Sequence, residues 1–170
     1  MSSPRSPQRA EAFAALGGAA VRVAEDSFFA YAEPCEPTRT ARLMQARPVD
    51  EPWLAVAIAF TGPFDGVVQV SLPRSLAADL GGAFCGVRPQ SLDGAQIADF
   101  AGELANMMCG LWLTQTHRSD RFALAAPVVT QAAAGDVAAS ADADPDGLGI
   151  VVNDTPLLLA LSAGKPVVSA

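Results

Sequence analysis

The sequence has very little of what metal and redox sites require. It contains one histidine, His117, and three cysteines, Cys35, Cys85 and Cys109, with no CxxC spacing. A zinc centre needs clustered His and Cys ligands, and a dithiol site needs two cysteines close together. We therefore expect neither site. Unpaired thiols are typical of a reducing compartment, so we expect a cytoplasmic protein.

Positive charge and long apolar runs are also scarce. Lys and Arg number 11 against 18 Asp and Glu, which gives a net charge of -7. This balance argues against a nucleic-acid or anionic-membrane partner. The longest apolar runs, such as residues 157–161, are far shorter than the roughly 20 residues of a membrane span. Residues 1–9 are polar and lack the apolar segment of a signal peptide.

The remaining composition is that of one globular domain. The chain has 170 residues, of which 51% are hydrophobic and 17% are charged. We expect a disordered tail over residues 1–9 and a single domain over residues 10–170. The expected domain has no second unit and no repeat.

Helical periodicity predicts three helices. Apolar residues at helical spacing indicate a helix over residues 10–32 and a short helix over residues 73–86. A longer helix begins after Asp93, which forms a capping box with Gln96, and runs to about Thr116.

Period-two patterns and turn signals predict strands separated by Gly, Pro, Asn and Asp residues. Residues 38–51 are either a strand or a long loop, and residues 132–147 are loop or weak structure. The predicted fold is α+β, with one β-sheet and helices packed on it. The expected strands cover residues 53–60, 67–72, 122–130, 149–152 and 157–161.

The long helix carries the polar residues of interest. Asp99, Glu103, Asn106 and Gly110 project to one face, and His117 joins them if the helix extends that far. Taken alone, this pattern is what any surface helix shows. The opposite face is apolar and should be buried; it consists of Ile97, Phe100, Ala101, Leu104, Met107, Met108 and Leu111.

The segment Asp99-Phe-Ala-Gly-Glu103-Leu-Ala-Asn106-Met-Met resembles the signature helix of the CheC/CheX chemotaxis phosphatases. That signature has Asp or Ser, Glu four residues later, Asn three further on, and a downstream proline, here Pro127. The resemblance covers residues 50–130 best. Some relatives carry a second Glu-x-x-Asn helix, but the only other asparagine here is Asn153, which excludes a second site. The chain thus resembles the single-site CheX branch, whose members are homodimers.

The resemblance implies a phosphatase that hydrolyses the aspartyl phosphate of a response-regulator receiver domain. Asn106 would orient the attacking water, as a glutamine does in small GTPases, and Glu103 would pair with the receiver's lysine. The receiver would supply Mg²⁺, and this chain would bind no metal or cofactor. We expect Gly102 and Gly110 to let the partner's backbone come close. We also expect a homodimer, with residues 149–152 as an exposed strand able to pair between subunits.

Several alternatives compete with this interpretation. A CheX-like module that binds a receiver or a flagellar-type partner without hydrolysis is the main one, although the presence of both Glu103 and Asn106 favours an enzyme. A nucleophile–base pair of Cys109 and His117 is disfavoured, because Cys109 lies near the buried stripe. The acidic segment 142–147 resembles half of an EF-hand loop but lacks its final glutamate, so we interpret it as a turn. We interpret Trp53 and Trp112 as core residues, and Arg39, Arg42 and Arg47 as a solvated edge.

Overall fold

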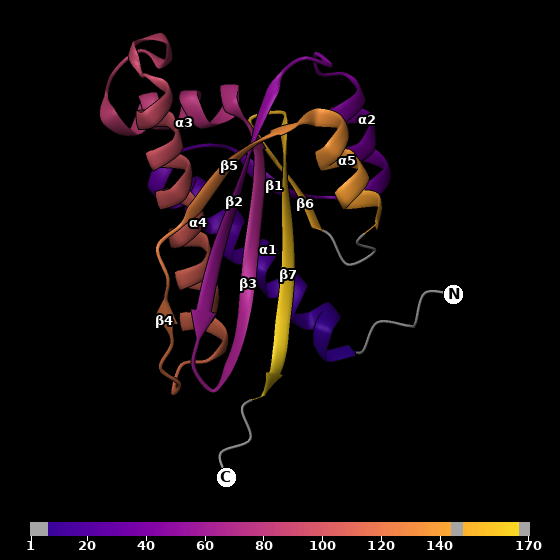
Figure 1. Cartoon of the computed structure of the whole chain (residues 1–170), viewed down its shortest axis with the longest axis vertical. Coiled ribbons are helices and arrows are strands. Elements are labelled where there is room, and N and C mark those ends of the chain that lie inside the picture. Colours follow the sequence, from indigo (N-terminus) through magenta and orange to yellow (C-terminus); the bar gives the residue numbers. More distant parts are fainter. Residues whose placement is uncertain (1–6, 144–147, 167–170) are drawn as a thin grey trace.

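The computed structural model describes residues 7–143 and 148–166. A seven-stranded antiparallel sheet runs through the molecule, with helices packed on both faces (Figure 1). The predicted α+β class and single sheet are confirmed.

The strands are β1 (Ala32–Cys35), β2 (Pro52–Thr61), β3 (Phe64–Pro73), β4 (Ala123–Leu124), β5 (Val128–Ala133), β6 (Leu148–Val152) and β7 (Thr155–Pro166). Their order in the sheet is β1-β6-β7-β3-β2-β4, and β5 also pairs with β2. The helices are α1 (Pro7–Phe28), α2 (Pro37–Gln45), α3 (Arg74–Cys85), α4 (Gly94–Thr116) and α5 (Ala134–Ala143), with a 3₁₀ turn at Pro89–Ser91.

The main core lies on the sheet face that α1, α3 and α4 cover. Every second residue of the central strands points to this face, and in β2 these are Leu54, Val56, Ile58 and Phe60, each at most 3% exposed. Helix α1 crosses behind the strands in Figure 1 and packs along α4. Burying large apolar side chains on this face supplies most of the driving force for folding. It also fixes α4 against the sheet.

The other face of the sheet carries smaller side chains and two short helices. Its residues include Ala55, Ser71 and Ala160, which alternate with the large apolar residues of the core face. Helices α2 and α5 lie side by side over one end of this face (Figure 1). Neither helix was expected: residues 38–51 were predicted as a strand or long loop, and residues 132–147 as loop or weak structure.

The two unexpected helices have weak sequence signals for identifiable reasons. Helix α2 buries only Thr40, which lies against Gly149, so no apolar stripe marks it. Pro37 lies in its first turn, where proline is a helix start signal. Helix α5 is largely alanine, and Val137 is its buried anchor. Tertiary contacts hold both helices in place, and the apolar periodicity of their sequences does not predict them.

Three predicted boundaries differ from the structure. Residues 7–9, expected in the tail, belong to α1, which ends at Phe28; residues 32–35, partly assigned to that helix, form β1. The strand expected over residues 122–130 is divided into β4 and β5, and Pro127 lies in the interruption. Proline lacks the N–H that a continuous ladder needs, which accounts for the division.

The expected intersubunit pairing through residues 149–152 is wrong. Strand β6 lies between β1 and β7 and is hydrogen-bonded on both sides. The sequence did not reveal β1 as a strand, so β6 was assigned to an edge. The exposed edges of the described sheet are β1 on one side and β4 with β5 on the other.

The turn chemistry predicted from the sequence is confirmed. Asn153 and Asp154 connect β6 to β7 with positive φ angles of 46° and 63°, which suit a tight hairpin turn. The Asn153 side chain also accepts a hydrogen bond from the Tyr31 backbone N–H, at 2.9 Å. Gly86 follows α3 in the left-handed conformation, with φ of 68°.

Trp53 and Trp112 are buried, as expected of core residues.

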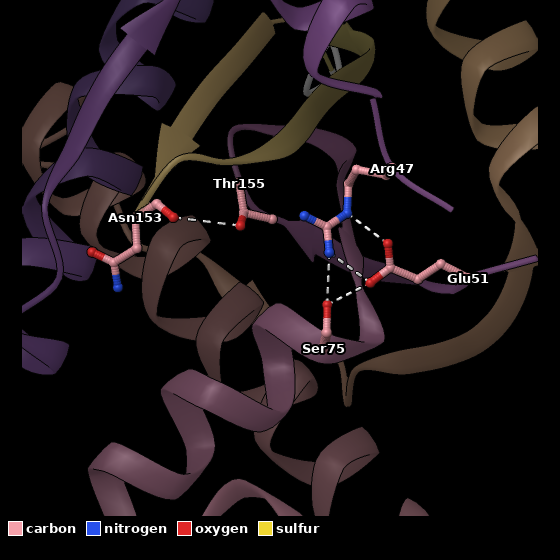
Figure 2. Close-up of polar contacts among 5 residues, drawn as sticks. All are labelled: Arg47, Glu51, Ser75, Asn153 and Thr155. Carbon is pink, nitrogen blue, oxygen red and sulfur yellow. Dashed lines mark hydrogen bonds and ion pairs between the residues drawn. The ribbon is translucent and has the colours of Figure 1, made fainter. Parts of the chain in front are cut away.

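A polar network ties the loop after α2 to the start of α3 (Figure 2). Arg47 donates two hydrogen bonds to the Glu51 carboxylate, at 2.6 and 2.7 Å, and a third to the Ser75 hydroxyl at 2.9 Å. Ser75 in turn donates to Glu51. These bonds lower the pKa of Glu51, with the Arg47 hydrogen bonds as the main cause. Arg47 is therefore a structural residue rather than part of a solvated edge. Arg39 and Arg42 are exposed, as expected of a solvated edge, and Arg39 pairs there with Glu33.

Candidate functional site

Helix α4 has the start that its sequence predicts. The Asp93 carboxylate accepts a hydrogen bond from the Gln96 backbone N–H at 2.8 Å, and the Gln96 side chain accepts one from the Asp93 backbone N–H at 2.9 Å. This reciprocal cap satisfies two donors that a helix N-terminus leaves free. Leu104 and Met108 are fully buried, so the rotation of the helix about its axis is fixed by packing.

Fixing that rotation turns the polar residues of the motif outward. Asp99 and Glu103 are exposed, and Asn106 and Gly110 are half-buried on the same face. Within residues 7–143 and 148–166, no side-chain hydrogen bond or ion pair engages Asp99, Glu103 or Asn106. A carboxylate and a carboxamide thus stand one turn apart on a rigid helix, free to bind groups of another molecule.

Pro127 lies against the motif helix although it is 21 residues away from Asn106 in sequence. A Cβ atom built on Gly102 would be 3.2 Å from Cβ of Pro127 and 3.6 Å from Cγ2 of Val129. Since Gly102 directly precedes Glu103, the segment before β5 flanks the motif. The structure therefore brings together four of the predicted site residues on one side of the molecule: Asp99, Glu103, Asn106 and Pro127.

The two glycines expected to contact a partner, Gly102 and Gly110, have different surroundings. Gly102 is buried, and the chain's own Pro127 segment fills the space above it, so that space is not open to a partner. Gly110 has no atom within 4 Å of the position that a Cβ would take. Close approach of a partner's backbone therefore remains a prediction for Gly110, whereas Gly102 serves close packing within the chain.

The side chains considered as a nucleophile and base do not form such a pair. Burial raises the pKa of the Cys109 thiol to about 12, so it stays protonated near neutral pH. His117 ends α4 and lies among aromatic rings, with centroids 5.0 Å from Phe64 and 5.5 Å from Phe122. It is thus part of an aromatic cluster rather than an extension of the motif face.

One feature beside the motif was not predicted from the sequence. Phe84 at the end of α3 is 60% exposed, and its ring centroid lies 5.5 Å from that of Phe28 and 6.1 Å from that of Phe100. Because Phe100 follows Asp99, this apolar surface lies close to the first turn of the motif. Phe84 continues the apolar spacing of α3, so the sequence indicated a buried residue.

Metal-binding and membrane-spanning features are both missing from the described part of the chain. The described residues contain no group of three or more His, Cys, Asp or Glu side chains that could hold a metal ion. The acidic segment 142–147 lies largely outside the described residues. No described helix has the length and apolar character needed to cross a bilayer. The absence of a bound cofactor stays a prediction.

Comparison with known proteins gives the family. The model of the family described as chemotaxis phosphatase CheX matches residues 54–145, more than half of the chain. No curated protein matches the sequence. Solved structures with a similar fold include the chemotaxis protein CheX from Vibrio vulnificus, with 15% identity and a TM-score of 0.65 over 94% of this chain and 100% of that one. CheX from Desulfovibrio desulfuricans has 14% identity and a TM-score of 0.60, covering 92% and 99%.

A third similar structure is the CheX-CheY-BeF3-Mg²⁺ complex from Borrelia burgdorferi, with 12% identity and a TM-score of 0.59, covering 91% and 97%. At these identities the likeness of the structures shows the fold, and the family model adds the membership. The matched region contains the whole of α4 and Pro127. The chain belongs to the chemotaxis phosphatase CheX family.

Proposed function

We propose that this protein hydrolyses the aspartyl phosphate of a response-regulator receiver domain, with Asn106 and Glu103 as its catalytic residues. The observation that carries the proposal is the pair itself. In a chain of the CheX family, an exposed carboxylate and a half-buried carboxamide project from one face of a rigidly packed helix, and neither has a partner among the described residues.

The chemistry needs a water held in line with the scissile bond. A receiver's aspartyl phosphate lies beside a metal ion and a lysine, which offset the charge on the phosphoryl oxygens. The Asn106 carboxamide can accept a hydrogen bond from water through its oxygen and donate through its NH₂ group. Holding the water in this way lowers the barrier by positioning, as in other phosphoryl-transfer enzymes. The hydrolysis transfers the phosphoryl group from the receiver's aspartate to water and yields inorganic phosphate.

Glu103 has a different part in the proposal. Its exposed carboxylate is one helical turn from Asn106 and is free to pair with the receiver's lysine. This pair would fix the receiver so that the Asn106 carboxamide meets the phosphoryl group. Mg²⁺ would come with the receiver. The complex of CheX with CheY, BeF3 and Mg²⁺ from Borrelia burgdorferi supports a receiver as the partner.

The rigidity of the site supports catalysis by positioning. Helix α4 is capped at its start and packed on the sheet through Leu104 and Met108. The segment containing Pro127 packs against Gly102 and restrains the side of the helix next to Glu103. A catalytic group held by such packing loses little entropy when the partner docks.

The test is phosphate release from a phosphorylated receiver by the full chain. Asn106→Ala should abolish most of the acceleration, whereas Thr114→Ala, a change on the exposed side of the same helix, should leave it intact. If Asn106→Ala releases phosphate as fast as the wild type, the protein is instead a non-catalytic module that binds a receiver or flagellar-type partner.

We propose in addition that the protein is a cytoplasmic homodimer. Intersubunit strand pairing would have to use β1 or the β4–β5 edge, because β6 is internal. Strand β1 is short and contains Pro34, which lacks a ladder donor, so β5 is the better edge for pairing.

A further inference from the structure

A cavity of about 510 Å³ lies on the sheet face opposite α4. Its floor is formed by Ala55, Ser71, Leu158 and Ala160 of the central strands, and its walls by α2 and α5. Met44 of α2 and Val137 of α5 are among the wall residues. The cavity is therefore distinct from the motif face, and neither Glu103 nor Asn106 lines it.

The cavity results from small side chains on facing elements. Ala55 and Ala160 stand where the core face has large apolar residues, and most of the α5 residues that line the cavity are small: alanine, glycine or serine. The small residues among the lining leave part of the space between the two helices and the floor unfilled. A volume of this size falls within the range of small-molecule sites.

The side chain of Ser71 indicates that the cavity binds a ligand. The residue is only 7% exposed and lies in the floor of the cavity. In the part of the chain that the structure describes, its side chain has no hydrogen-bond partner. Ser71 Oγ is not among the buried unpaired side-chain atoms of the described residues, so it is open to the cavity and available to form a hydrogen bond with a ligand group.

The charges around the cavity limit the class of ligand. Arg47 is a lining residue, but its guanidinium is engaged by Glu51 and Ser75 (Figure 2). Asp136 is an exposed carboxylate at the border. An anionic ligand therefore finds no free cation among the described lining residues, and a cationic ligand finds no buried carboxylate there. We propose that the cavity binds a small uncharged molecule with an apolar body and one hydrogen-bonding group, which pairs with Ser71.

Two probe molecules that differ by one hydroxyl test this assignment. Benzyl alcohol and toluene are titrated separately into the ¹⁵N-labelled full chain, and backbone amide shifts are followed. Benzyl alcohol should shift Ala55, Ser71 and Ala160 saturably, and it should bind about threefold to tenfold more tightly than toluene, the value of one hydrogen bond. Ser71→Ala should remove that preference while leaving the binding of toluene intact.

Variants that fill the cavity with a larger side chain identify where the probe molecules bind. Ala138→Leu adds a side chain at a lining position of α5, and Ala41→Leu does the same from α2. Either variant should abolish the saturable shifts, so that one informative result remains if the other variant unfolds. Ala139→Leu is the matched control, because Ala139 is an exposed residue of α5 outside the lining; it should bind as the wild type does.

Three results would overturn the proposal. The first is the lack of saturable shifts at the floor residues, and the second is equal affinity for the two probes in the wild type. The third is a change of the same amide signals with protein concentration alone, confirmed by sedimentation, which would show that a second copy of the chain covers the cavity.

Discussion

The proposed division of labour between Glu103 and Asn106 leads to different effects of their substitutions. Asn106 acts on the water, so its contribution appears in the transition state. Asn106→Ala should lower the rate constant for phosphate release by about 10²-fold or more, equivalent to about 2.7 kcal/mol, with almost no change in receiver affinity. Both side chains project from the exposed side of α4, so neither substitution should disturb folding.

The exposure of Glu103 sets the size of its effect on binding. Ion pairs formed by exposed side chains are worth about 0.2–1 kcal/mol, so Glu103→Ala should weaken receiver affinity by only about 1.4-fold to fivefold. Its effect on the rate should be larger than this, because a shifted receiver also misplaces the phosphoryl group relative to Asn106. Glu103→Gln, which keeps the size of the side chain but not its charge, should reproduce the affinity loss.

The assay combines single-turnover phosphate release with receiver binding by titration calorimetry, at low and high salt. The affinity difference between wild type and Glu103→Ala should shrink as salt increases, since the screening length falls from about 10 Å at 0.1 M to about 3 Å at 1 M. Thr114→Ala serves as the control on the same helix. An affinity loss in Asn106→Ala equal to its rate loss would refute the division, because it would show that Asn106 binds the receiver rather than orients water.

Three further predictions concern the scaffold. Glu51→Gln should lower the free energy of unfolding at pH 7 by about 1–3 kcal/mol. Arg47 lowers the pKa of Glu51, so this stabilisation is present above the ordinary carboxyl pKa of 4.5 and is lost as the pH falls through the lower pKa of the folded state. Acid denaturation curves of the wild type and the variant should therefore converge. A difference in stability that stays constant with pH would contradict the network. Gly110→Ala should raise the free energy of unfolding by about 0.5–1 kcal/mol. Gly102→Ala should raise it less, since the added Cβ would lie 3.2 Å from Pro127. Equal increases in chemical denaturation would show that Pro127 does not restrict Gly102. Sedimentation velocity at micromolar concentration should show a dimer, and Val128→Pro on β5 should favour the monomer; a monomeric wild type would remove the homodimer proposal.

The motif helix is the part of the site that sequence reasoning predicted well. Its cap depends on two residues three positions apart, and its orientation depends on a local apolar stripe anchored by Leu104 and Met108. Local interactions of this kind are encoded within a few residues. The outward direction of Glu103 and Asn106 was predictable for the same reason.

The residues next to the motif were harder to predict. Gly102 was expected to face a partner, but it packs under Pro127, which comes from a separate strand segment. Phe84 follows the apolar spacing of α3, yet it is largely exposed beside Phe100. Both outcomes depend on how distant segments meet, which periodicity along one element does not record.

By itself, the sequence determined the α+β class, the capped motif helix, the β2–β3 and β6–β7 hairpins and their turns, because each follows from local spacing and backbone preference. Only the tertiary structure decided the rest. It placed β6 between β1 and β7, formed α2 and α5 from weakly patterned segments, and brought Pro127 to the motif. It also left a cavity over Ser71. The physical reason is that strand order and helix docking are fixed by long-range packing, in which side chains far apart in sequence must fit one another.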